Sequence, residues 1–165
     1  MPYRRRTPSW TEGTRTLGTW DAGPFDNDDA ADFANELDDT PEHERLALIR
    51  AVLTTTAEND TYLDYDDGAP AVAAAALVAC HLPGGEQFAP NGYGPEAPAP
   101  DALLDLVPLA ISAIDRVLAA DSELASLWSE DTRAQRPWHT SMLQLKSVLL
   151  GAVNDGMDPL FELAP

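Results

Sequence analysis

Cysteine, lysine and histidine are scarce in this chain of 165 residues. Cys80 is the only cysteine, which excludes a disulfide within the chain, and its apolar surroundings predict a buried, inert thiol. The histidines His43, His81 and His139 have no zinc-ligand spacing, and the His-Glu-x-x-His motif is absent. Cys80 and His81 are adjacent, so on a helix their side chains would point about 100° apart and could not form a nucleophile–base pair.

Long apolar runs and the short motifs of several enzyme classes are also missing. The longest apolar run, residues 69–82, contains Pro70 and is shorter than the ~20 residues that a membrane-spanning helix needs. No signal-peptide pattern, Gly-x-Ser-x-Gly motif, phosphate-binding loop or dinucleotide fingerprint occurs. We therefore expect a cytoplasmic protein without membrane contact, and the sequence favours a non-enzymatic role.

Acidic residues dominate the charge. There are 28 aspartate and glutamate residues against 10 lysine and arginine residues, which gives a formal net charge of −18 and an isoelectric point near 4.1. Such a field repels the phosphates of nucleic acids and of anionic lipids. It favours a basic protein partner or divalent cations. We expect a basic protein as partner and no nucleic acid.

The length predicts one folded domain. Residues 1–17 are rich in arginine, threonine and serine without periodicity, so we expect a flexible N-terminal extension there. The domain is expected over residues 18–155, followed by a C-terminal tail at 156–165. Residues 83–100 hold five prolines and four glycines, which predicts one long loop.

Apolar residues recur at helical spacing through most of the domain, and no stretch alternates as a β-strand does. This pattern predicts an all-α single-domain bundle of five to six helices. Thr40 is a candidate cap with Pro41 as the first helical residue. Pro108 is expected to break or kink a later helix. The expected helices cover residues 28–37, 41–57, 70–82, 101–119, a stretch capped by Asp121, and 137–153.

The first expected helix carries a row of carboxylates. Asp28, Asp32 and Glu36 are spaced by four residues and share one face. Together with Asp64 and Asp67 from the next acidic turn, they could hold Mg²⁺ or Ca²⁺ through oxygen ligands. The sixth-position glycine and the twelfth-position glutamate of a calcium-binding loop are absent. Helix capping and a solvated helix face are the plainer interpretation.

The most distinctive stretch is residues 18–33, in which a turn rich in glycine and aromatic residues precedes an acidic helix start. We expect Trp20 and Phe25 to fold back onto the core, with Asp26 or Asn27 as the helix cap. This segment resembles the start of the bacterial domain-of-unknown-function 4259 family. The residues that carry the resemblance are Gly18, Thr19, Trp20, Gly23, Pro24, Phe25, Asn27, Asp28, Ala30, Asp32 and Phe33.

Two later stretches extend the resemblance to about residue 150. They are Tyr62-Leu63 and residues 116–128. The resemblance implies a helical fold and supplies no activity. The N-terminal extension and the 83–100 loop depart from the family's pattern.

The charge and the missing enzyme motifs favour a non-enzymatic acidic protein-binding module. An immunity or antitoxin-like protein would be one form of it, since acidic surfaces steer and complement basic toxins. The alternative is a divalent-metal-dependent hydrolase that uses the acidic face of the first helix. Self-association through an apolar face is a third option, and the oligomeric state is open.

Overall fold

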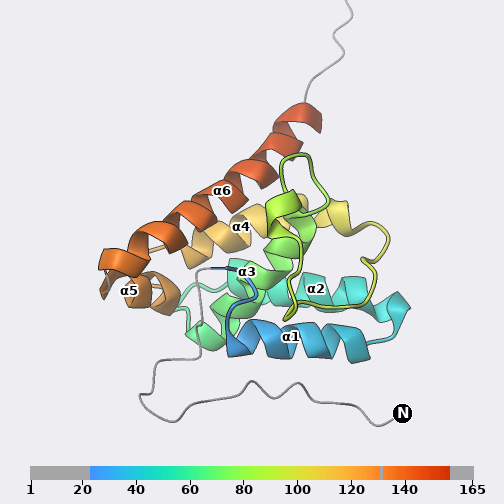
Figure 1. Cartoon of the computed structure of the whole chain (residues 1–165), viewed down its shortest axis with the longest axis horizontal. Coiled ribbons are helices and arrows are strands. Elements are labelled where there is room, and N and C mark those ends of the chain that lie inside the picture. Colours follow the sequence, from blue (N-terminus) through green and yellow to red (C-terminus); the bar gives the residue numbers. More distant parts are fainter. Residues whose placement is uncertain (1–22, 131, 157–165) are drawn as a thin grey trace, which may run out of the picture.

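A computed structural model describes residues 23–130 and 132–156 of the chain. Within these ranges the chain forms six α-helices and two short 3-10 helices, with no strand (Figure 1). The α-helices are α1 (Asp28–Asp39), α2 (Glu42–Ala57), α3 (Tyr65–Ala79), α4 (Val107–Val117), α5 (Glu123–Glu130) and α6 (Thr132–Gly156), and the 3-10 helices are η1 (Glu86–Phe88) and η2 (Leu103–Leu106). The predicted all-α single-domain bundle is confirmed. No helix in the described part is long and apolar enough to cross a bilayer.

The apolar helix α3 forms the centre of the bundle. It contacts α1, α2, α4, α5 and α6, and residues 71–79 are all buried. Figure 1 shows α3 between α1 and α2 on one side and α4 and α6 on the other. Its small side chains allow close approach: a Cβ added at Gly68 would lie 2.9 Å from Cδ1 of Leu124 on α5. A helix that is apolar on nearly all sides must be enclosed in this way.

The predicted bounds of α3 are wrong at both ends. The helix begins at Tyr65 rather than at Pro70, and it ends at Ala79 rather than near Leu82. Pro70 lies in its second turn, where the missing N–H leaves the carbonyl four residues earlier without its helical partner. The first turn forms nevertheless because the Tyr65 N–H donates to the carboxylate of Glu123, 2.7 Å away.

Two further start signals were misassigned. Thr40 does not cap α2, because its hydroxyl donates to the Glu36 carbonyl at 2.7 Å and closes the end of α1. Pro41 lies before α2 rather than within it. The helical stretch expected over residues 101–119 is divided next to Pro108: η2 ends at Leu106, α4 begins at Val107, and Pro108 occupies the first turn of α4, where a backbone N–H has no helical partner.

The cap of α5 also differs from the prediction. The Asp121 carboxylate accepts a hydrogen bond from Arg116 at 3.0 Å and is turned away from the helix start. The Ser122 hydroxyl instead accepts from the Ala125 N–H at 3.5 Å, and the Ser122 carbonyl accepts from the Ser126 N–H at 3.0 Å. Ser122, the residue just before α5, is therefore its N-cap.

Two tryptophans close the junction of α5 and α6. The rings of Trp128 and Trp138 stack with centroids 5.9 Å apart and planes 7° apart. Trp138 is buried and Trp128 packs against the core. Both rings therefore contribute to the packing of the core, whereas Trp20 lies outside the described residues.

Candidate functional site

Four carboxylates interact where the N-terminal ends of α1 and α3 meet. Asp28, Asp29 and Asp32 belong to α1, and Asp66 lies in the first turn of α3. Burial and the charge of Asp32 raise the pKa of Asp28. Burial, followed by the charges of Asp66, Asp32 and Asp28, raises the pKa of Asp29. Within the described part of the chain, none of the four forms an ion pair. We call these four residues the acidic cluster.

Like charges are held together here although they repel one another. The positive ends of the α1 and α3 dipoles offset part of the repulsion, because both helices begin at the cluster. Asp28 and Asp32 were predicted as a pair from their spacing. Asp66 was only one of several acids in the next turn, and nothing local in the sequence indicates that it lies near Asp29.

The five predicted metal ligands lie on α1 and at the start of α3. Asp28, Asp32 and Glu36 follow one another along α1, Asp64 immediately precedes α3, and Asp67 lies in its first turn. Asp32, Glu36, Asp64 and Asp67 are all exposed. Among the described residues, no three histidine, cysteine or acidic side chains are placed as metal ligands.

The signature segment builds the entry to α1. The Asp26 N–H donates to the Gly23 carbonyl at 3.1 Å, and the Gly23 N–H donates to the Asp26 carboxylate at 3.0 Å. The Asn27 side chain is buried and accepts from the third N–H of α1 at 2.8 Å, as an N-cap does. Phe25 and Phe33 are buried in the core. The signature residues outside the described part of the chain are Gly18, Thr19 and Trp20.

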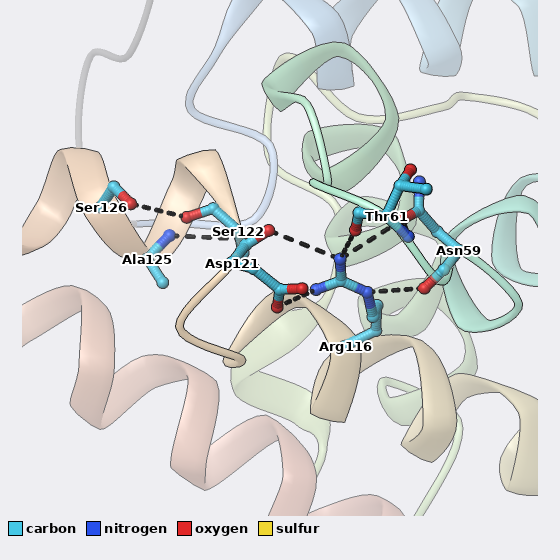
Figure 2. Close-up of polar contacts among 7 residues, drawn as sticks. All are labelled: Asn59, Thr61, Arg116, Asp121, Ser122, Ala125 and Ser126. Carbon is cyan, nitrogen blue, oxygen red and sulfur yellow. Dashed lines mark hydrogen bonds and ion pairs between the residues drawn. The ribbon is translucent and has the colours of Figure 1, made fainter.

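Arg116, near the end of α4, joins two loops that are distant in sequence (Figure 2). Its Nε donates to the Asn59 carbonyl at 2.8 Å, and one terminal nitrogen donates to the Asp121 carboxylate at 3.0 Å. The other terminal nitrogen donates to the Thr61 carbonyl and to the Asn59 side chain. The Arg116 side chain is only 11% exposed. Its donors are used within the protein, so its role is to hold the loops in place.

A backbone pairing extends this junction. The Leu63 N–H donates to the Asp121 carbonyl, and the Glu123 N–H donates to the Leu63 carbonyl, each at 2.9 Å. Glu123 then caps α3 through the Tyr65 N–H. The two later stretches of family resemblance therefore lie side by side, and their residues serve the fold.

The long loop after α3 is attached to α1. Asp38 accepts from the Glu96 N–H at 3.1 Å and from the Ala97 N–H at 2.7 Å. The Asp26 carboxylate accepts from the side-chain amide of Asn91 at 2.8 Å. In Figure 1 the yellow-green segment returns beside α1 and α2. Sequence reasoning missed both anchors, because Asp38 is one acid among many on its helix.

Beneath this loop lies an apolar cavity of about 300 Å³. Leu37, Ile49 and Leu77 line it from the helices, Cys80 and His81 line it just after α3, and Leu103 with alanines and prolines of the loop forms the other wall. The Cys80 thiol donates to the Leu77 carbonyl at 3.2 Å, and burial raises the pKa of this thiol. Cys80 is half-buried rather than fully buried, because it follows the last turn of α3. A thiol with a raised pKa is a poor nucleophile at neutral pH.

A profile for the family described as Domain of unknown function (DUF4259) matches residues 18–141, which is more than half of the chain. The match includes the signature segment, the Arg116 junction and the long loop. No curated protein and no solved structure matches the chain.

Proposed function

Since the chain belongs to the DUF4259 family, whose description gives no activity, we propose its function from its surface: it is a non-enzymatic module that binds a basic protein through the acidic cluster. The family match comes with no reaction that could be transferred. The divalent-metal-dependent hydrolase stays the alternative, and among the described residues no three carboxylates are placed as metal ligands.

The grouping of four carboxylates at the starts of α1 and α3 carries this proposal, and the raised pKa values of Asp28 and Asp29 follow from burial and repulsion there. They mean that the free protein holds negative charges at a place where the charges repel one another and are partly removed from water. An arginine or lysine of a partner placed between Asp29 and Asp66 would replace this repulsion with attraction. Binding would thus relieve an unfavourable feature of the unbound protein.

The net charge of −18 supports the same partner chemistry over a longer range. An acidic field accelerates the approach of a basic protein and slows that of nucleic acids. Most of this effect is lost in salt, since exposed charges are screened beyond about 10 Å at 0.1 M ionic strength. An immunity or antitoxin-like protein that neutralises a basic toxin is the form of module that this chemistry suits best.

A pull-down from the organism that encodes the chain tests the proposal. The immobilised protein is compared with the double variant Asp29→Asn/Asp66→Asn and with the control Asp101→Asn/Asp105→Asn, whose residues are exposed and distant in sequence from the cluster. All captured proteins are quantified at low and at moderate salt. The two variants lose the same number of negative charges.

We expect the wild type and the control to retain one basic protein that the cluster variant does not retain. Equal retention by all three would show that the acidic cluster is not the binding site. Capture of no basic protein at low salt would contradict the proposal as a whole.

A further inference from the structure

We propose that the cavity beneath the long loop binds a small, uncharged, apolar molecule of one or two rings. The proposal is independent of the protein-binding function, because it concerns the opposite end of α3 from the acidic cluster. It depends on the size of the cavity, the chemistry of its walls and the attachment of its outer wall.

The size fits such a ligand. An apolar cavity of about 150 Å³ in another protein stays dry and accepts benzene. The cavity here has about twice that volume, about 300 Å³, at the lower end of the range of small-molecule pockets. The cavity is partly open to solvent, because several of its lining residues are exposed, so an apolar occupant would displace water from apolar walls.

The residues that line the cavity disfavour a charged ligand. Leu37, Ile49 and Leu77 come from three different helices, and the loop adds four prolines and three alanines. The Cys80 thiol already donates to the Leu77 carbonyl, and its raised pKa keeps it neutral. The one imidazole of the lining, that of His81, is exposed at the edge of the cavity, so a polar group that left water for the interior would find few partners. An anion would in addition meet the negative field of the whole chain.

The outer wall is held in place before any ligand arrives. Asp38 fixes the loop through the N–H groups of Glu96 and Ala97. The loop is also compact, since a Cβ added at Gly94 would lie 2.4 Å from the Pro90 Cβ. Prolines restrict the backbone further. A preformed cavity binds without the entropy cost of ordering a loop.

Cys80 provides a direct test, because it lines the cavity and is the only cysteine in the chain. Iodoacetamide alkylation at pH 9 is followed by mass spectrometry with and without indole, a neutral two-ring probe. By mass action, indole at nine times its dissociation constant slows alkylation about tenfold. The probe indole-3-acetate has the same rings and a negative charge, and we expect it to protect at least about tenfold less well.

Two variants test whether indole protects Cys80 from alkylation by binding in the cavity. Ala97→Phe fills the space from the loop and keeps the N–H that bonds to Asp38, whereas Ala47→Phe places the same side chain on an exposed position of α2 outside the cavity. We expect indole to protect Cys80 in the wild type and in Ala47→Phe, and to lose its effect in Ala97→Phe. If Ala97→Phe does not fold by circular dichroism, Ala89→Phe on the same wall replaces it.

Each outcome decides the question. Protection that disappears only in the filled variant supports the proposal. Absence of protection in the wild type at millimolar indole overturns it. Protection that persists in the filled variant also overturns it, because indole would then bind outside the cavity. Equal protection by indole-3-acetate and indole overturns it as well, because the site would then not prefer an uncharged ligand.

Discussion

The Glu123 carboxylate accepts a hydrogen bond from the Tyr65 N–H at 2.7 Å, so a residue of α5 caps the central helix α3. A second bond, from the Glu123 N–H to the Leu63 carbonyl at 2.9 Å, fixes the same two segments. Capping usually comes from the residue just before a helix. Here it depends on tertiary structure, and the first turn of α3 depends on the docking of α5.

Removing this cap should loosen the start of α3. Glu123→Ala is expected to lower the free energy of unfolding by about 1 kcal/mol, the usual value of a helix cap. Glu123→Gln keeps an acceptor and loses only the charge near the helix dipole, so its effect should be smaller, about 0.5 kcal/mol. Urea unfolding measures both, and amide hydrogen exchange at Tyr65 locates the effect. Equal stability of Glu123→Ala and the wild type would contradict the capping role.

Arg116 should matter far more than its ion-pair partner. Arg116→Ala leaves the carbonyls of Asn59 and Thr61 without their donor, and losing hydrogen bonds to a charged group costs about 2 kcal/mol. Asp121→Asn removes only an exposed charge, since the Asp121 side chain is 60% exposed, and should cost under about 0.5 kcal/mol. Thermal unfolding of the two variants distinguishes the contributions. If both variants lose the same stability, the ion pair rather than the carbonyl contacts holds the junction.

The adjacent glycines Gly84 and Gly85, which follow α3, should differ in the stability lost when each is replaced by alanine. A Cβ at Gly85 would lie 1.8 Å from the Ala79 carbonyl oxygen, a backbone atom that cannot yield, so Gly85→Ala should cost at least about 2 kcal/mol. Gly84 has open space but a φ of +79°, so Gly84→Ala should cost about 1 kcal/mol. Chemical denaturation gives both values. The reverse order would contradict the close approach at Gly85.

The acidic cluster should make stability depend on pH. The folded state raises the pKa of Asp29 above its ordinary value of 3.8, so the folded protein binds this proton more tightly than the unfolded chain does. The resulting penalty is complete at neutral pH and disappears as the pH falls through the raised pKa toward 3.8. Asp29→Asn should therefore be more stable than the wild type at pH 7.

Because Asp29 is partly exposed, solvent screening should keep this gain to about 0.2–0.5 kcal/mol, the usual size of a like-charge pair on a helix. The gain should vanish near pH 3.8 and shrink in high salt. The control Asp101→Asn should show no such pH dependence. Urea unfolding at several pH values gives the comparison, and a variant less stable than the wild type at pH 7 would contradict the repulsion.

Sequence periodicity predicted those helices that carry a single apolar stripe. The helix expected over residues 28–37 is α1, which continues only two residues further, to Asp39. The start of α3 was missed because its cap comes from Glu123. Pro70 was predicted as a helix start because proline is common at the first position of a helix. In the structure, packing on all sides of α3 allows a proline in its second turn.

The acidic cluster was predictable only within α1. The four-residue step of Asp28 and Asp32 is a local property of a helix. The interaction of Asp29 with Asp66 exists because α1 packs against α3, and the anchoring of the loop by Asp38 exists because that loop returns to α1. Contacts between distant segments of this kind leave no periodic signal in a single sequence.

An affinity comparison decides whether the acidic cluster binds a basic protein. The basic protein recovered by pull-down is titrated calorimetrically into the wild type, Asp29→Asn/Asp66→Asn and Asp101→Asn/Asp105→Asn. We predict that the dissociation constant rises about tenfold or more for the cluster variant and less than about twofold for the control, which has the same net charge. Equal dissociation constants for the two variants would contradict the claim, because net charge alone would then account for binding.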